Sequence, residues 1–177
     1  NAQIFVFEPN PRHYPLLKER FQNNSNVYIY KKAVSNKTKE SIFYDVSGEG
    51  QSSLLRFQGH EFGSKAHIID IITVQTTRLD DIEEIKGKEI DMLQVDVQGA
   101  ELLVLQGAEE TLKNTNSLML EVHTEDYILP ADREPYRGQC YLPQLIEYFK
   151  NSETNIRCQF VGLDNENQNG QGNSFWF

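Results

Sequence analysis

The stretch Ile90–Ala108, IDMLQVDVQGAELLVLQGA, decides the fold of this chain. Its first part is almost continuously apolar, as expected of a parallel strand that is covered on both faces. Gln98-Gly99 then supplies a tight turn, and beyond it apolar residues recur at helical spacing. The stretch therefore predicts a buried strand, a turn and a helix. Asp96 lies near the carboxyl end of the predicted strand, which is where open α/β sheets bind ligands.

A second strand–helix unit opens the chain. Residues 4–7 are apolar and end in Glu8, and Asn10 followed by Pro11 is a favourable start for a helix. A strand that ends in an acid before a capped helix is half of a dinucleotide-type βαβ unit, in which the acid binds ribose hydroxyls. The glycine-rich turn of such a unit should lie about 20 residues before the acid. We therefore expect one domain over residues 1–177 that lacks its N-terminal first strand and glycine loop.

Further apolar stretches predict the remaining elements. The predicted strands are residues 27–34, 67–76, 117–123, 156–163 and 174–177, and residues 141–150 predict a helix. Residues 41–57 contain two strand-like stretches around a turn signal, Ser47-Gly48-Glu49-Gly50, and predict an inserted antiparallel hairpin. Asp80 and Glu83 have capping-box spacing, so we interpret Asp80 as structural. The pattern as a whole is α/β.

Composition excludes several classes of function. The chain has 177 residues, of which 38% are hydrophobic and 24% charged, as in a soluble globular domain. A net charge of −9 argues against a nucleic-acid partner or an anionic membrane surface. No stretch is long and apolar enough to predict a membrane span, and no signal peptide is visible. Cys140 and Cys158 do not form a disulfide framework, so we expect reduced thiols in a cytoplasmic protein.

Acidic and basic side chains gather at the predicted strand ends. Glu8 ends the first strand, Asp96 ends the central strand, and Glu101 lies in the first turn of the helix that follows. Glu121 and His123 are two residues apart on the next strand, so they share one face of it. If the strands of Asp96 and His123 are neighbours, these groups converge on one crevice. Each also has a simpler interpretation, such as Glu101 complementing the helix dipole.

Other chemistries find little support in the sequence. Asp96, Glu121 and His123 are possible metal ligands, but their spacing is generic and no metal site is predicted. The sequence contains no nucleophile elbow, phosphate-binding loop or zinc-ligand pattern. Hydrolase and phosphotransferase activities are therefore not indicated.

Several segments carry a family resemblance along essentially the whole chain. They are FVFEPNP (5–11), KKAVSN (31–36), TRLDD (77–81), LQVDVQGAELLVLQGA (93–108) and LMLEVH (118–123). In order and spacing they resemble the FkbM-type methyltransferases. The resemblance implies a class I S-adenosylmethionine fold, with a mostly parallel sheet, helices on both faces and an antiparallel last strand. It also implies methyl transfer to a hydroxyl, often on a sugar, a glycan or a secondary metabolite.

The resemblance also assigns residues to the donor site. Glu8 would hold the ribose of S-adenosylmethionine, with Asn10 also assigned to the donor site. The end of the Ala33-Val34 segment would border the adenine. Asp96 would face the methionine end of the donor and the acceptor.

The implied chemistry needs help in removing a proton, because an alcohol is a weak nucleophile. Asp96 or His123 is the candidate base, whereas Glu101 and Glu121 would orient acceptor hydroxyls or a partner side chain. We expect residues 47–66 and 124–138 to select the acceptor. Two alternatives stay open: an NAD(P)-dependent oxidoreductase, because an acid that ends the second strand also fits that cofactor, and a non-catalytic binding module.

Overall fold

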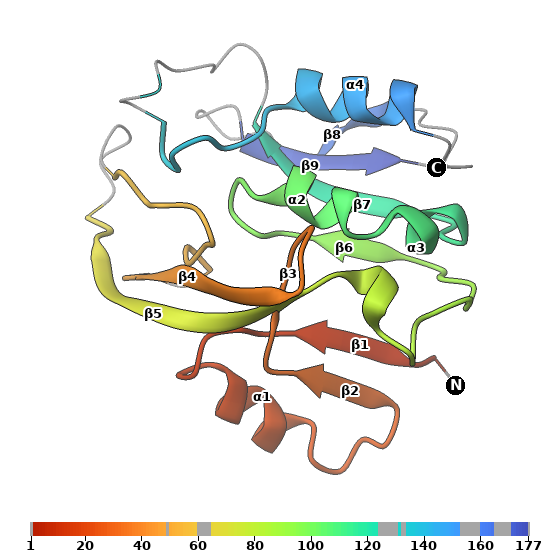
Figure 1. The fold of residues 1–177 in the computed structure, drawn as a ribbon, viewed down its shortest axis with the longest axis horizontal. Coiled ribbons are helices and arrows are strands. Elements are labelled where there is room, and N and C mark those ends of the chain that lie inside the picture. Colours follow the sequence, from red (N-terminus) through yellow and green to blue (C-terminus); the bar gives the residue numbers. More distant parts are fainter. Residues whose placement is uncertain are drawn as a thin grey trace.

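The computed structural model describes residues 2–48, 50–59, 65–123, 131, 134–152, 160–164 and 171–176. Their strands and helices follow one another in the order of Figure 1. In chain order they are β1 (Ile4–Phe7), α1 (Tyr14–Arg20), β2 (Val27–Tyr30), β3 (Ala33–Val34), β4 (Lys39–Val46), β5 (Ile68–Thr77), the 3₁₀ helix η1 (Leu79–Asp81), β6 (Leu93–Val95), α2 (Glu101–Gln106), α3 (Glu109–Lys113), β7 (Leu118–His123), α4 (Leu142–Asn151), β8 (Phe160–Asp164) and β9 (Gln171–Trp176).

Two parallel strand pairs, each built with a helical crossover, form the frame of the fold. The first is β1–α1–β2, in which β1 pairs with β2, and the second joins β6 to β7 through α2 and α3. The strand β9 then pairs antiparallel with β7, and β8 pairs antiparallel with β9. The arrows of β1, β2 and β6 point to the same side in Figure 1. The α/β class, the neighbouring central strands and the antiparallel last strand are thus confirmed.

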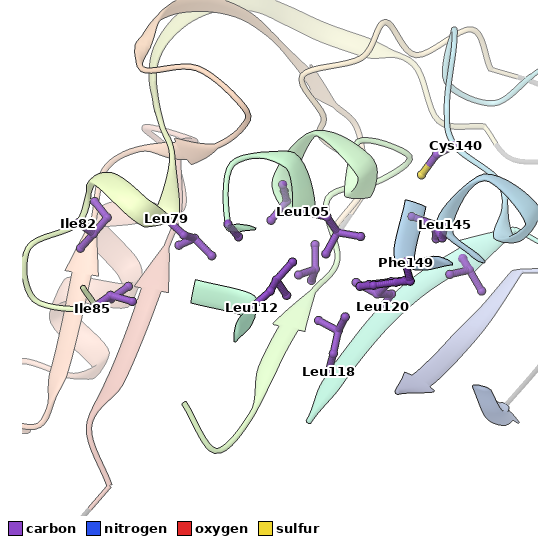
Figure 2. Close-up of a cluster of buried hydrophobic side chains, with 14 residues drawn as sticks. Leu79, Ile82, Ile85, Leu105, Leu112, Leu118, Leu120, Cys140, Leu145 and Phe149 are labelled. Atoms are coloured by element: carbon purple, nitrogen blue, oxygen red, sulfur yellow. The ribbon is translucent and has the colours of Figure 1, made fainter. Parts of the chain in front are cut away.

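The main hydrophobic core lies between β6 and β7 and the helices that cover them. Figure 2 shows leucine side chains of α2, α3, α4 and β7 pointing into one cluster, with η1 and the turn after it at one end. The fully buried members include Leu105 on α2, Leu112 on α3 and Leu145 on α4, none of which is exposed. A smaller cluster holds Ala33, Phe43 and Val74 beneath the β4–β5 ribbon. The helical faces predicted for residues 100–108 and 141–150 therefore do point inward.

The predicted hairpin over residues 41–57 has a different main partner. β4 pairs antiparallel along its whole length with β5, across the intervening residues 47–67. The second predicted arm touches β4 at one bridge, between Tyr44 and Ser53. The hairpin prediction was wrong in its pairing because β5, with ten residues, offers β4 a much longer ladder than residues 53–57 can.

Three other boundaries also differ from the sequence prediction. Residues 27–34 form two strands in two sheets rather than one, because the chain turns at Lys31-Lys32. The helix predicted from Asn10 begins at Tyr14, with His13 as its N-cap. The helix predicted over residues 100–108 is α2, which ends at Gln106 with Gly107 as its C-cap, and a separate helix, α3, follows it.

Asp80 is structural, but its partners are not those of the predicted capping box. Its carboxylate accepts hydrogen bonds from the backbone N–H groups of Glu110 and Thr111 and from the Thr111 hydroxyl. It therefore caps the amino end of α3, while Arg78 forms a 3.1 Å ion pair with it. A carboxylate at the start of a helix satisfies backbone donors that the helix leaves unpaired.

Candidate functional site

The loop after β6, residues 96–99, has an unusual backbone conformation that the side chain of Glu101 stabilises. Gln98 has a φ of 56° and Gly99 a φ of 89°, both in the left-handed region that non-glycine residues rarely adopt. One carboxylate oxygen of Glu101 accepts hydrogen bonds from the N–H groups of Val97 (3.2 Å) and Gly99 (3.1 Å). Glu101 is only 2% exposed, and burial raises its pKa to about 7 although these donors favour its charged form. The loop conformation therefore depends on a buried carboxyl group.

The same loop is also held from the side by Ser53. The Ser53 hydroxyl lies 3.1 Å from the carbonyl oxygen of Val97 and 2.9 Å from that of Gln98, and it donates to them. Ser53 is almost fully buried and is bridged to Tyr44 of β4 through backbone hydrogen bonds. The segment after β4 is thereby attached directly to the loop that carries Asp96.

Gln98 joins the two candidate carboxylates. Its side-chain Nε2 donates to Asp96 Oδ1 at 2.8 Å and also to Glu121 Oε2. Its Oε1 lies 3.0 Å from the hydroxyl of Tyr136, which also lies 2.8 Å from the carbonyl of Gln51. Burial raises the pKa of Tyr136 well above its usual range, so this hydroxyl keeps its proton and donates. Asp96 and Glu121 therefore do converge at one edge of the sheet.

His123 lies deeper in the structure than the two carboxylates. It is 8% exposed, and its ring meets that of Tyr141 edge to face with centroids 6.3 Å apart. Burial lowers the pKa of His123 to about 4, so the imidazole is neutral near pH 7. A neutral imidazole with so low a pKa accepts a proton less readily than an ordinary histidine.

Glu8 stands at the carboxyl end of β1 in a turn that Asn10 fixes. Glu8 Oε1 accepts a 2.7 Å hydrogen bond from the Asn10 N–H, and His13 lies 4.0 Å from Glu8 Oε2. Burial raises the pKa of Glu8, partly offset by the hydrogen bond from Asn10. The side chain of Asn10 is 99% buried in protein contacts: Oδ1 accepts from Arg12 N–H, and Nδ2 donates to Asp45. Asn10 thus shapes the turn that presents Glu8.

Asp45, at the end of β4, connects this turn to the segment that reaches the Asp96 loop. It is 3% exposed and accepts from Asn10 (2.8 Å), Arg12 (2.5 Å) and the Ser52 hydroxyl (3.1 Å). Burial alone would raise the pKa of Asp45, but these three donors together lower it. Ser52 is the neighbour of Ser53, so a continuous run of contacts joins the turn of Glu8 to the loop of Asp96.

The two residues predicted to border the adenine pack in hydrophobic clusters. Ala33 is buried against Phe43 and Val74, and Val34 packs against the main core. Two segments were predicted to select the acceptor. Most of residues 124–138, and residues 60–64 of the segment 47–66, lie outside the described residues.

Within the described part of the chain, no group of three or more His, Cys, Asp or Glu side chains is arranged to hold a metal ion. No helix described in the structure has the length and hydrophobicity needed to cross a membrane.

Sequence reasoning missed four residues that organise this site. They are Asp45, Ser53, Gln98 and Tyr136. Gln98 was interpreted only as a turn residue, although a glutamine at the first turn position, where glycine or asparagine is favoured, was a signal of another role. Asp45 was an acid inside an apolar, β-type stretch, and a buried acid needs partners. Nothing in the sequence singled out Ser53 or Tyr136.

The fold contains two parallel βαβ pairs and an antiparallel return strand, and acids lie at the carboxyl ends of β1 and β6. These features define a class I methyltransferase-like α/β protein. A solved structure of the methyltransferase FkbM from Methylobacillus flagellatus KT has the same fold, with a TM-score of 0.58 and 12% identity over 99% of this chain. Residues 2–151 match the family model of the methyltransferase FkbM domain. The chain therefore belongs to the FkbM methyltransferase family.

The chain is also similar to a curated protein. The 2-O-methyltransferase NoeI of Sinorhizobium fredii (strain NBRC 101917 / NGR234) is 30% identical over 161 residues, which cover 86% of this chain. The chain spans 63% of the length of that relative and 36% of the Methylobacillus protein.

Proposed function

We propose that this chain carries an S-adenosylmethionine-dependent O-methyltransferase activity directed at a hydroxyl of a sugar, a glycan or a secondary metabolite. The observation that carries the proposal is the contact run Glu8–Asn10–Asp45–Ser52, which ties a ribose-binding turn to the loop of Asp96 through Ser53. A donor nucleoside and an acceptor hydroxyl need two such loops at one sheet edge. The family and the name of the relative NoeI support the same chemistry.

The donor side fits the nucleoside of S-adenosylmethionine. Glu8 Oε1 is engaged by Asn10, whereas no hydrogen bond among the described residues engages Glu8 Oε2. That oxygen is available to accept from ribose hydroxyls, which is the role an acid has at this position of a dinucleotide-type unit. The acidic chain also tolerates the positive charge of a sulfonium donor.

A further strand is part of this proposal. Within the described residues, β1 pairs only with β2 and β6 pairs only with β7, so β1 and β6 each have one edge without a partner strand. Ile4 and Met92, just before or at the start of these strands, are about half exposed. We propose that a parallel strand and its glycine loop, contributed from outside residues 1–177, pair with one of these open edges and complete the donor site.

When bound, the donor would supply a sulfonium methyl group that an acceptor oxygen attacks in line, and a neutral thioether would leave. Asp96 is the proposed base, because it is exposed and only its Oδ1 is engaged by Gln98. The acceptor proton would pass to Asp96 Oδ2 as the new C–O bond forms and the C–S bond breaks. His123, which is buried and neutral, would keep water away from the acceptor side. Glu101 would hold the loop that carries Asp96.

The test uses the full-length gene product. Isothermal calorimetry with S-adenosylmethionine should show micromolar binding that Glu8→Ala abolishes, and transfer of a radioactive methyl group to a panel of methyl glycosides should fall at least 100-fold in Asp96→Asn. Glu19→Ala, which removes an exposed carboxylate from α1 of the same strand–helix unit, is the matched control for donor binding. Binding without any methyl transfer would favour the non-catalytic module, and absence of donor binding would refute the proposal.

A further inference from the structure

Every polar atom of the Gln98 side chain has a defined partner. Its two Nε2 protons point to carboxylates on neighbouring strands, Asp96 after β6 and Glu121 on β7. Its Oε1 accepts a 3.0 Å hydrogen bond from the Tyr136 hydroxyl. Rotating the amide by 180° would place Oε1 against two carboxylates. The amide orientation is therefore determined by its surroundings.

The chain keeps this side chain in place at an energetic cost. Gln98 is 8% exposed, and its φ of 56° is unfavourable for a residue with a Cβ. The side chains of Ser53 and Glu101 form hydrogen bonds with the backbone of the loop and hold it in this conformation. Strain of this kind persists where the surrounding structure requires it, often at functional sites.

The amide also resolves an electrostatic conflict. Two carboxylates that approach one another repel, so one of them tends to keep a proton. A neutral amide that donates one proton to each allows both to be ionised side by side. Without that amide, no donor would lie between Asp96 and Glu121, and their repulsion would turn Asp96 away.

We propose that Gln98 is the positioning residue of the acceptor side: its amide, oriented by Tyr136, holds Asp96 and Glu121 side by side so that Asp96 faces the acceptor hydroxyl as its base. This inference rests on the proposed function and adds to it the group that fixes the place of the base. It also connects the base to the segments of Tyr136 and Gln51, both of which reach the same amide cluster.

The chain offers a matched control for this test. Gln75 also donates from Nε2 to a carboxylate, that of Glu40, at 3.0 Å, but it lies exposed on β5. Gln98→Glu and Gln75→Glu therefore make the same chemical change beside a carboxylate, one inside the site and one on the surface. Tyr136→Phe is the second variant, because it removes one hydroxyl and keeps a ring against Phe57.

The first measurement follows side-chain amide protons by NMR and needs no acceptor. The Gln98 protons should exchange with solvent at least tenfold more slowly than those of Gln75, and Tyr136→Phe should speed up the exchange of Gln98. Equal exchange rates for the two glutamines would overturn the proposal, because the amide would then not be held.

The second measurement is methyl transfer to the methyl glycosides as a function of pH. Gln98→Glu should lower kcat about 10- to 100-fold near neutral pH, the range for a lost hydrogen bond to a charged group, and should recover activity as the pH rises. Its affinity for S-adenosylmethionine should stay within threefold of the wild type, as should that of Gln75→Glu. A uniform loss at every pH, or an unchanged profile, would refute the positioning role while leaving the methyltransferase proposal standing. Failure of the wild type to transfer methyl groups would refute both.

Discussion

Gly107 offers the sharpest test of how closely α2 packs against the segment after β3. It ends α2 with a φ of −94°, a conformation that alanine also adopts. A Gly→Ala change at such a position normally stabilises a protein by about 0.4–1 kcal/mol, because it reduces the entropy of the unfolded chain. In this fold, however, a Cβ on Gly107 would lie 2.0 Å from the carbonyl oxygen of Ser35 and 3.2 Å from the Cα of Asn36. Both obstacles are backbone or close to it, so no side-chain rotation relieves them.

Neither partner can move away easily. The Ser35 N–H donates to the Thr77 carbonyl at 2.9 Å, and the Gly107 carbonyl accepts from Asp80 at 3.2 Å. Relief requires a shift of about 1 Å or more between α2 and the segment after β3. We expect Gly107→Ala to lower the free energy of unfolding by about 3 kcal/mol, the upper end of the range for overpacking, or the melting temperature by about 6–12 °C.

Urea and thermal unfolding followed by circular dichroism measure this effect. Gly87→Ala is the control, because Gly87 has no neighbour within 4 Å of the added Cβ but a φ of 69°. It should lose only about 1–2 kcal/mol, the cost of a left-handed conformation. A Gly107→Ala protein as stable as the wild type, or more stable, would show that α2 does not approach the segment after β3 as the structure has it.

The remaining predictions concern charged groups. The pKa of Glu101 is raised to about 7 in the folded state, so the folded protein holds an extra proton between about pH 4.5 and 7. The free energy of unfolding therefore falls with rising pH by up to about 1.4 kcal/mol per pH unit. Glu101→Gln should abolish that slope in denaturant titrations at several pH values. The pKa of His123 is lowered to about 4 in the folded state, so the free energy of unfolding decreases as the pH falls from about 6.5 to 4. His123→Phe should therefore make the protein more resistant to acid in the same assay. Asp45→Asn should weaken donor binding about 5- to 30-fold in calorimetry, since it removes the charge that Arg12 meets at 2.5 Å; an unchanged affinity would show that the turn of Glu8 holds its shape without that charge.

The parts of the fold that the sequence predicted are those in which local pattern and tertiary environment agree. The segment from Leu93 to Val104 is apolar where β6 and α2 are buried, so its periodicity was sufficient. The acids at the ends of β1 and β6 follow directly from that pattern. The pairing of β4 was not predictable, because residues 53–57 and 68–77 are both strand-like and only the longer ladder decides between them.

The site was less predictable than the fold, because its organising residues act through contacts across long stretches of chain. Gln98 meets Glu121 and Tyr136, which lie 23 and 38 residues away. Ser53 meets the carbonyl of Gln98 across 45 residues. Neither hydrophobic periodicity nor turn chemistry carries information on such pairs, so the sequence could place the carboxylates but not the amide between them.

The burial of Asp45 also bears on how the two sides of the site are related. A buried ion pair is a poor source of stability, because the cost of removing two charges from water often exceeds their attraction, and apolar side chains of similar size commonly do as well. Arg12 keeps half of its side chain in solvent. Its charge therefore stays partly hydrated, and water screens part of its attraction to Asp45. Unlike an apolar side chain, the carboxylate accepts three directed hydrogen bonds, two from the turn of Asn10 and Arg12 and one from Ser52. Such bonds fix angles as well as distances, and the two turns they join are those that lead to Glu8 and to the loop of Asp96. For in-line methyl transfer, in which donor and nucleophile must meet at a defined distance and direction, that geometric constraint matters more than the stability that the same volume of leucine would supply.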